Sequence, residues 1–282
     1  MAIKGKFKKH LHITEELLRE EWINNRMSQA NIAKKYDVPI STIESRIKAF
    51  NLIGLRDSTR YTLDESKLCI DDPIFCYYLG LIVTDGYING EKGYVSLRLA
   101  NEGAKEILEK IKNYFNYTGI IREYLNHSTL SYDLTICSAK LISRLAELGI
   151  QTKAKTYDVN YIQINKLDNK AMFFRGILDG DGSLHVQTNE KTFLVTFRVV
   201  MASQIFMKDF LKDINDTLSL TIKMKKHKRQ ANNEIVYYPK IEMKKYETKV
   251  FLDFLYNGWE EYKLPKKYER YLLIKDEDIV HT

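Results

Sequence analysis

The chain has few cysteines and no long apolar run. Its 282 residues include three cysteines, Cys69, Cys76 and Cys137. That odd number, without a C-x-x-C pair or a Cys and His spacing that suits zinc, argues against a disulfide framework and against a zinc site. We infer a reducing, intracellular compartment. No stretch of about 18 uninterrupted apolar residues occurs, and the basic N-terminus lacks an apolar signal core, so neither a membrane span nor secretion is expected.

The composition is basic. Lys and Arg number 44 against 37 Asp and Glu, which gives a net charge of +7 and a pI of about 9.0. Such a charge suits a polyanionic partner. The length allows about two domains and a substantial buried core. Composition therefore fits a nucleic-acid enzyme, although charge alone names no activity.

Two segments of the chain are nearly the same. Each is an apolar run with an internal glycine that ends in Asp-Gly: Tyr78-Leu-Gly-Leu-Ile-Val-Thr-Asp85-Gly86 and Phe174-Arg-Gly-Ile-Leu-Asp-Gly-Asp181-Gly182. The offset is 96 residues (181 − 85), and Asp72 and Asp168 repeat at the same offset (168 − 72). These two acids suit helix N-caps, and the closing glycines suit left-handed C-caps. We therefore predict a duplicated helix.

The acid before each closing glycine needs compensation, because a carboxylate at a helix C-terminus faces the negative end of the helix dipole. If the helices pack side by side through Gly80 and Gly176, Asp85 and Asp181 also repel each other. A divalent cation answers both problems, since Mg²⁺ prefers carboxylate, carbonyl and water oxygens. The alternative, for one copy alone, is an ordinary polar turn that closes a buried helix.

These segments resemble the signature helices of the LAGLIDADG homing endonucleases, in the form with two motifs on one chain, and the resemblance covers residues 70–275. It implies that Asp85 and Asp181 are metal-binding catalytic acids. It also implies that the carbonyls of Thr84 and Gly180 face the metal, and that Gly80 and Gly176 form the helix interface. The sequence departs from the motif at position two, with Leu79 and Arg175, and at position six, with Val83 against Asp179. The residues at position two must then point away from the interface.

The remaining pattern predicts an α+β fold. Period-two alternation predicts half-buried antiparallel strands at 94–100, 130–136 and 193–199, and helical spacing occurs at 104–114, 140–148, 205–218 and 248–256. Each copy reads helix, hairpin, helix, hairpin, helix. The resemblance implies a pseudo-two-fold duplicated αββαββα fold whose saddle-shaped sheets lie on DNA. The polar residues that alternate with apolar neighbours are then DNA-facing, or else an ordinary wet face: Ser96, Arg98, Ser131, Asp133, Thr135, Thr196 and Arg198.

A basic hairpin lies in the second copy. Eight Lys and Arg occur from Lys223 to Lys245, with two acids, Glu234 and Glu242. Such a hairpin can neutralise phosphates and give binding a steep salt dependence. We assign DNA contacts to Lys223, Lys225, Arg229 and Lys240. The alternative is a solvated basic ribbon.

The first 57 residues read as three short helices that resemble a helix-turn-helix module. Ser28 and Ser41 suit N-caps. In such modules the second helix of the pair enters the major groove, which makes Ser41, Thr42, Ser45, Arg46 and Lys48 candidate DNA contacts. The alternative is a small helical bundle that contacts protein. We expect this all-α module over 1–57, a linker over 58–72, a first repeat over 73–165 and a second repeat over 166–282.

Phosphodiester hydrolysis also needs charge stabilisation at the phosphate and at the leaving oxygen. A lysine-bearing segment follows the last helix of each copy. The resemblance implies that a basic residue there approaches the metal site, and the best matches are Lys155 and Lys267, with Lys153 and Lys266 close behind. The alternative role for these lysines is a simple interaction with a helix dipole.

We therefore interpret the chain as a monomeric, site-specific double-strand DNA endonuclease that uses Mg²⁺, with Mn²⁺ able to substitute. It would hydrolyse one phosphodiester per strand at a long pseudo-palindromic site. The resemblance implies intron homing or a free-standing gene as the setting, in a prokaryotic or phage-infected cell or an organelle. An intein origin is not expected, because the chain has no leading Cys or terminal His-Asn. The alternatives are a DNA-binding transcriptional regulator that does not cut, and an RNA maturase that assists intron splicing.

Overall fold

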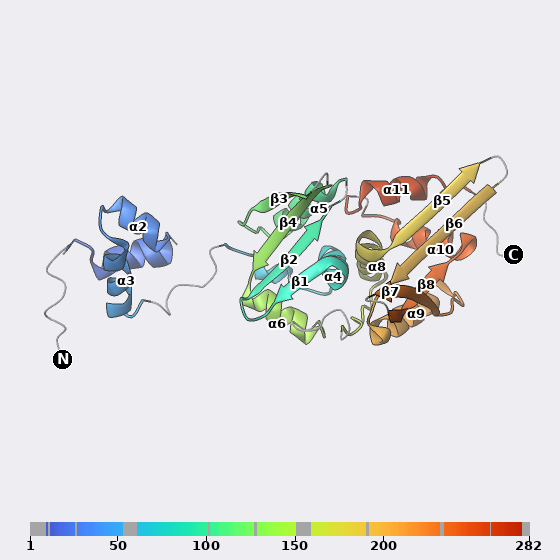
Figure 1. Ribbon diagram of the computed structural model, residues 1–282, viewed down its shortest axis with the longest axis horizontal. Helices are drawn as coiled ribbons and strands as arrows, with labels where there is room; N and C mark the ends of the chain where they lie inside the picture. The colour runs from blue at the N-terminus through green and yellow to red at the C-terminus, as the bar shows by residue number, and fades with distance from the viewer. Residues whose placement is uncertain are drawn as a thin grey trace. The chain divides into compact units, whose positions relative to one another are not determined.

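The computed structural model describes residues 10, 12–25, 27–52, 61–100, 102–126, 129–150, 159–189, 192–231, 234–259 and 261–277. The chain divides into two compact units, Met1–Arg60 and Tyr61–Thr282 (Figure 1). No helix in the described part of the chain is both long and apolar enough to cross a membrane.

The smaller unit contains the three expected short helices. Helix α1 (Glu15–Leu18) continues into a π-helical segment, η1 (Arg19–Asn24), and is followed by α2 (Gln29–Lys35) and α3 (Ile40–Ala49). Ser28 caps α2, because its Oγ accepts a hydrogen bond from the Asn31 N–H at 3.1 Å. Ser41 is not a cap, since α3 begins after Pro39 and Ser41 lies inside the first turn. The buried core is Ile13, Leu18, Ile32, Ala33, Val38, Ile43, Ile47 and Leu52.

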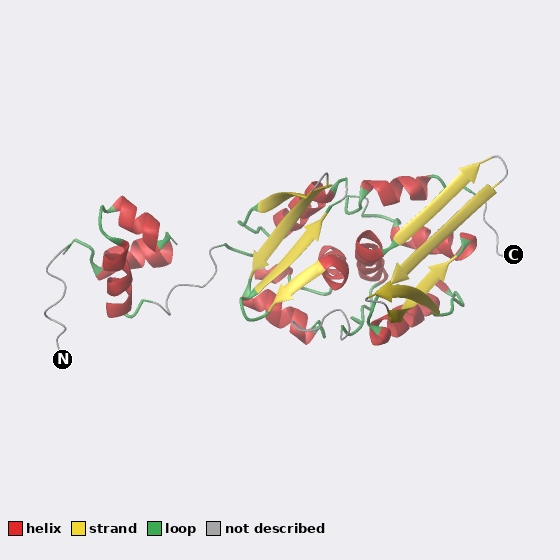
Figure 2. Cartoon of the chain, in the orientation of Figure 1, coloured by secondary structure: helices red, strands yellow, loops and turns green. Residues whose placement is uncertain are grey.

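The larger unit has the α+β architecture that the sequence predicts, with helix, hairpin, helix, hairpin and helix in each copy (Figure 2). The first repeat consists of α4 (Pro73–Asp85), β1 (Gly86–Asn89), β2 (Tyr94–Leu99), α5 (Ala104–Tyr114), β3 (Ile121–Asn126), β4 (Thr129–Cys137) and α6 (Ala139–Glu147). The second consists of α8 (Leu167–Asp181), β5 (Ser183–Asn189), β6 (Thr192–Val200), α9 (Gln204–Leu218), β7 (Lys225–Ala231), β8 (Glu234–Met243) and α10 (Lys245–Leu255), followed by α11 (Pro265–Leu272).

The two sheets have the same topology. Their strand orders are β1-β2-β4-β3 and β5-β6-β8-β7, and all neighbours are antiparallel. One face of each sheet is apolar and buried under helices, and its residues include Val95, Leu97, Leu134 and Ile136 in the first sheet and Val195, Phe197, Val199 and Ile241 in the second. Because side chains alternate along a strand, the residues between them form the opposite face, which we call the polar sheet face.

Residues 61–72 belong to the larger unit instead of forming a linker. The N–H of Thr62 donates to Thr118 Oγ1 at 2.8 Å, and the N–H of Asp64 donates to the Phe115 carbonyl oxygen at 2.8 Å. A short 3₁₀ turn, η2 (Glu65–Lys67), follows. This stretch is polar, but its backbone is held by the first repeat, so the expected linker over 58–72 is too long.

Two details of the duplicated helices differ from expectation. Asp72 caps α4 as predicted and accepts from the Ile74 N–H at 2.8 Å, whereas α8 begins at Leu167 and places Asp168 in its first turn. Gly86 and Gly182 are extended, with φ near −71° and −72°, and are not left-handed caps. Each helix passes directly into a strand, and glycine is needed because a Cβ would lie 2.6 Å from the carbonyl oxygen of Ile82 or Leu178.

Candidate active site at the ends of two paired helices

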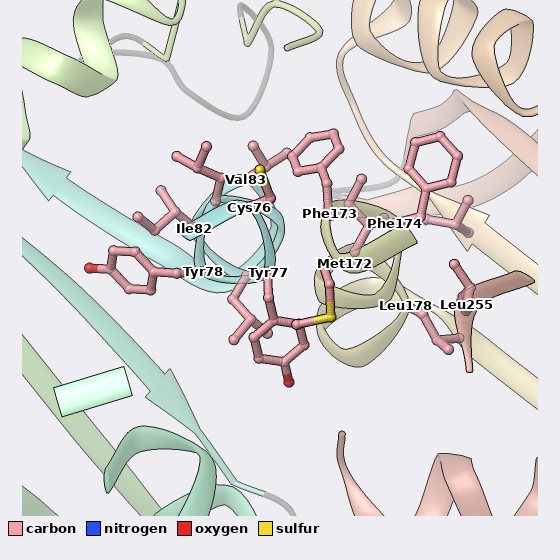
Figure 3. Close-up of a cluster of buried hydrophobic side chains, with 14 of the residues drawn as sticks. Cys76, Tyr77, Tyr78, Ile82, Val83, Met172, Phe173, Phe174, Leu178 and Leu255 are labelled. Atoms are coloured by element: carbon pink, nitrogen blue, oxygen red, sulfur yellow. The ribbon is translucent and has the colours of Figure 1, made fainter. Parts of the chain in front are cut away.

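Helices α4 and α8 pack backbone against backbone, at Gly80 and Gly176. A Cβ added to Gly80 would lie 2.3 Å from the Phe173 carbonyl oxygen, and one added to Gly176 would lie 2.3 Å from that of Tyr77. Figure 3 shows the two helices side by side. No side chain larger than hydrogen fits at either glycine, so the sequence sets this close approach.

The close approach brings the C-terminal ends of the helices together. A Cβ on Gly180 would lie 1.9 Å from Thr84 Oγ1 and 2.9 Å from Asp85 Oδ2. Asp85 and Asp181 are both exposed to solvent. Their carboxylates both raise the pKa of one ammonium group, that of Lys267. The two acids that the repeat singles out therefore share one polar neighbourhood.

Lys267 extends from α11 to the end of α8. Its Nζ donates to the carbonyl oxygens of Leu178 at 2.5 Å, Asp179 at 2.7 Å and Gly180 at 3.4 Å. The ammonium thus compensates the negative end of the α8 dipole. Burial lowers the pKa of Lys267, while the nearby carboxylates of Asp179, Asp85 and Asp181 raise it. Lys266 is exposed, and Lys153 and Lys155 lie outside the described residues.

Two residues that stand in the sequence only as departures from the motif occupy central positions. Arg175 is fully buried, and its guanidinium donates to the carbonyl oxygens of Leu255, Gly258, Trp259 and Tyr262. Asp179 Oδ2 accepts hydrogen bonds from the Tyr77 hydroxyl at 2.8 Å and from the Leu264 N–H at 3.2 Å. Burial raises the pKa of the Asp179 carboxyl to about 6, against the opposing effect of Lys267. The available signal was an Arg and an Asp, four residues apart, inside an apolar helix.

The polar sheet face carries the same pair of charges in both repeats. Arg98 Nε lies 3.6 Å from Asp133 Oδ2, and Arg198 Nε lies 2.7 Å from Glu242 Oε2, in each case across neighbouring strands. Asp133 also accepts hydrogen bonds from the hydroxyls of Ser96 at 2.6 Å and Thr135 at 2.7 Å. Both arginines are more than half exposed, so their guanidinium groups are available above a fixed carboxylate.

Not all predicted residues of this face are open to a ligand. Ser131, Asp133 and Thr196 are buried, with 9%, 4% and 7% exposure. The register of β3 against β4 adds Arg122 and Tyr124 to the polar sheet face. Sequence reasoning missed them, because β3 has no alternation of buried and exposed residues that could have revealed the strand.

The basic hairpin of β7 and β8 divides its charges between two faces. Lys225 pairs with Lys240 and Arg229 with Val236, which puts these three basic residues on the polar sheet face, while Lys226 and Lys228 lie on the other. Lys223 precedes β7. Hydrogen bonds from Lys225 and Lys240 lower the pKa of Glu242 to about 2. Part of the positive charge is therefore already balanced by this acid.

The second helix of the N-terminal pair is only partly available. Ser41, Ser45 and Lys48 of α3 are exposed, and Thr42 is half-buried. Arg46, predicted as a DNA contact, is only 4% exposed, and its guanidinium donates to the Ile13 carbonyl oxygen. It packs in the core of the smaller unit and is withdrawn as a DNA contact.

The donors at the helix ends suit a hard divalent cation. They are oxygens of Asp85 and Asp181 together with backbone carbonyls, a set that Mg²⁺ or Mn²⁺ prefers. The Gly180 carbonyl also accepts from Lys267, so the carboxylates are the principal ligands available. Among the residues that the structure describes, no three His, Cys, Asp or Glu side chains gather as a metal cluster. A bound ion would then complete its shell with water or substrate oxygens, as Mg²⁺ commonly does.

Comparisons with known proteins give structural likeness at low identity. No protein-family model matches the chain, and no curated protein matches it. The homing endonuclease I-WcaI bound to its DNA recognition sequence superimposes with a TM-score of 0.48 at 17% identity, over 78% of this chain and 96% of that one. The LAGLIDADG homing endonuclease I-GzeII in complex with its DNA target gives 0.44 at 15%, over 72% and 89%.

Full-length DUF199/WhiA from Thermatoga maritima gives a TM-score of 0.47 at 13% identity, over 77% of this chain and 66% of its own. The chain thus spans slightly less than two thirds of that protein. The structure is similar to LAGLIDADG homing endonucleases and to WhiA, and the likeness extends no further than the arrangement of the chain.

Proposed function

We propose that the chain is a metal-dependent, site-specific double-strand DNA endonuclease that acts as a monomer. One observation carries the proposal: two repeated helices packed backbone to backbone end in exposed carboxylates, Asp85 and Asp181, near one partly buried ammonium, Lys267, which donates to the carbonyls at the end of α8. One acid per repeat suits a chain in which each repeat cuts one strand. The signature-helix resemblance in the sequence supports the same reading.

The polar sheet faces are the proposed DNA surface. The exposed guanidinium groups of Arg98 and Arg198 can donate two hydrogen bonds to a guanine edge or to a phosphate. Lys225, Arg229 and Lys240 of the basic hairpin can neutralise backbone phosphates. The net charge of +7 favours encounter with a polyanion. In the smaller unit, Ser41, Thr42, Ser45 and Lys48 remain the proposed contacts.

Hydrolysis would proceed by attack of a water oxygen on phosphorus, with cleavage of one bridging P–O bond. The water loses a proton, and the leaving oxygen gains one. A bound Mg²⁺ or Mn²⁺ ion supplies an acidified water and neutralises phosphate charge. Asp85 and Asp181 would hold the ion and orient water by accepting its hydrogen bonds. The ammonium of Lys267 would hold the end of α8 in place and add positive potential where the phosphate develops negative charge.

The test is cleavage of a randomised duplex library by the full chain with Mg²⁺, in parallel with Ca²⁺ and with the Asp85→Asn protein, followed by sequencing of the bound and cut fractions. Cutting at one long, imperfectly palindromic motif, with Mg²⁺ and with both acids intact, is the expected result. Cutting that survives Asp85→Asn, or that shows no sequence preference, would contradict the proposal.

A second candidate is a DNA-binding regulator that keeps the fold and does not cut. The observation in its favour is the N-terminal unit, in which α2 and α3 are joined by a four-residue turn, residues 36–39, a length that suits a helix-turn-helix module. Specific binding without cutting in the same library experiment would select it. If the protein neither binds nor cuts DNA, the RNA maturase is favoured. Its test is splicing of an intron with and without the protein.

A further inference from the structure

The segment that delivers Lys267 is tied to α8 at its beginning. After α10 ends at Leu255, the chain continues as the α10–α11 connection, residues 256–264. Arg175 donates to the last carbonyl of α10 and to those of Gly258 at 3.1 Å, Trp259 at 2.7 Å and Tyr262 at 3.1 Å. The guanidinium also lies 5.1 Å from the centre of the Tyr256 ring. Its planar fork thus bonds backbone carbonyls from the end of α10 to Tyr262 at once.

The same segment is tied to α8 at its end. Asp179 lies four residues after Arg175, hence on the same face of α8. Its Oδ2 accepts from the N–H of Leu264, the residue immediately before α11. It also accepts from the hydroxyl of Tyr77, which belongs to α4 of the other repeat. The first turn of α11 is therefore fixed against both helices whose C-termini carry the acids.

The two residues that make these hydrogen bonds, Arg175 and Asp179, are buried charges, which a fold rarely keeps without a role for them. Burial of a guanidinium or a carboxylate carries a large desolvation cost, which is repaid only when close hydrogen bonds satisfy the charge. Arg175 is 0% exposed and Asp179 is 1% exposed. At the same positions of the first repeat, 96 residues earlier, the chain has Leu79 and Val83, which are buried and apolar. The duplicated fold does not itself require charges at these positions.

We propose that Arg175 and Asp179 are positioning residues, which set Lys267 beside Asp85 and Asp181 by holding the α10–α11 connection. The inference rests on the proposed endonuclease function for its effect on catalysis. Lys267 is the third residue of α11, so a shift of the first turn of that helix moves its Nζ directly. Displacement of a catalytic group by about 1 Å can cost about 100-fold in rate. Because Lys267 hydrogen-bonds the carbonyls at the end of α8, the helix that carries Asp181, its displacement should slow the strand cut at Asp181 more than the other strand.

The test measures the cutting rate of each strand separately. A duplex carrying the selected site, with a different fluorophore on each 5′ end, is cut by saturating full-length protein with Mg²⁺. Asp179→Val introduces the residue of the first repeat and removes both hydrogen bonds. Asp179→Asn keeps an acceptor oxygen for both donors, since Tyr77 and Leu264 use the same atom, Oδ2. Tyr77→Phe removes only the bond from the other repeat.

Asp213→Asn is the matched control. Asp213 is also buried, and it pairs with Lys170 of α8 at 2.6 Å, but within the described part of the chain it bonds neither the α10–α11 connection nor Lys267. We expect Asp179→Val to slow one strand by about tenfold or more and the other by less than about twofold, with unchanged DNA affinity. Asp179→Asn should recover most of the lost rate. Equal slowing of both strands, or the same strand ratio in Asp213→Asn, would reduce Asp179 to a stabilising residue and overturn the proposal.

A second readout does not depend on cleavage. Amide hydrogen exchange of the metal-free, full-length protein should be faster over residues 262–268 in Asp179→Val than in wild type, and unchanged there in Asp213→Asn. Unchanged exchange over 262–268 in Asp179→Val would show that the tie does not hold α11 and would overturn the inference. If wild type does not cut DNA, the endonuclease proposal fails, while the exchange result still decides whether Asp179 holds Lys267 in place.

Discussion

The two signature helices are alike at the glycines where their backbones touch and different at two other buried positions. Gly80 and Gly176 are equivalent, and each lies against the backbone of the other helix. At two other equivalent positions, α4 has Leu79 and Val83, whereas α8 has Arg175, which bonds its own repeat, and Asp179, which bonds Leu264 of its own repeat and Tyr77 of α4. The two copies therefore agree where the helix backbones touch, where a change on one helix would disturb both, and differ at positions away from that contact.

The polar sheet faces of the two repeats are likewise partly alike and partly different. Both sheets keep an arginine over a carboxylate, Arg98 with Asp133 and Arg198 with Glu242. The second repeat adds lysines to this acid, since Lys225 and Lys240 both contact Glu242. The two halves thus present related but unequal charge patterns. A DNA site that fits both halves need not be a perfect palindrome.

The largest expected effect comes from the two equivalent acids at the ends of α4 and α8. Asp85→Asn and Asp181→Asn should each reduce double-strand cutting by about 1,000-fold, because each removes a carboxylate needed at the reacting phosphate. DNA affinity in Ca²⁺ should stay within a few-fold of wild type. Gel analysis of a plasmid with the selected site measures linear and nicked products. Linear product from Asp181→Asn at the wild-type rate would count heavily against the assignment.

The next effect concerns the helix contact. Gly80→Ala and Gly176→Ala should destabilise the fold by about 3 kcal/mol each, and by similar amounts, since either Cβ would lie 2.3 Å from a backbone oxygen. Gly93→Ala is the control: its φ of +67° strains alanine, but no atom lies within 4 Å of the added Cβ. We expect about 1 kcal/mol there. Urea unfolding measures all three, and clearly unequal costs at Gly80 and Gly176 would break the symmetry argued for this contact.

A smaller effect separates the faces of the basic hairpin. Substitution of Lys225 and Arg229 by Ala should reduce the slope of log affinity against log salt by about 2, because each phosphate that is no longer neutralised lowers the slope by about 0.9. Lys226→Ala with Lys228→Ala removes the same charge from the opposite face and should leave the slope nearly unchanged. Fluorescence anisotropy over a range of salt concentrations gives both slopes. Equal changes would indicate general charge attraction and no defined DNA face.

The smallest effect concerns Glu242 and pH. Its folded pKa of about 2 lies below the ordinary value of 4.5, so the carboxylate stabilises the fold above pH 4.5 and loses this contribution as pH falls toward 2. We expect the free energy of unfolding of wild type to exceed that of Glu242→Gln by about 1 kcal/mol at neutral pH, a value reduced for solvent screening. The difference should fall by more than half at pH 3. Urea unfolding at both pH values checks this, and a pH-independent difference would show that the charge of Glu242 is not responsible.

The sequence predicted what periodicity and repetition encode. The duplicated helices, the order of elements and the strands β2, β4 and β6 follow from regular alternation or helical spacing. It did not reveal β3, whose side chains are nearly all exposed, or the extended glycines at Gly86 and Gly182, because a Gly after a helix usually signals a left-handed cap.

The roles of single buried charges were also beyond the sequence. Arg46 looked like a surface residue of a recognition helix, yet it is buried and bonds the Ile13 carbonyl, a partner 33 residues away. Arg175 bonds carbonyls 80 to 87 residues away. Helical spacing places a residue on a face, but only the tertiary fold determines which distant backbone atoms meet that face.

The extended glycines at the ends of α4 and α8 connect each helix-end carboxylate directly to a strand of the sheet. Asp85 is the last residue of a helix and Gly86 the first of a strand, and in the second repeat only Gly182 separates Asp181 from β5. A carboxylate placed for chemistry is thus a fixed number of peptide bonds from the strand that would touch the bases. If the chain cuts DNA as proposed, this junction fixes the distance between the bases recognised and the bond attacked, which then cannot change without bending a helix or a sheet.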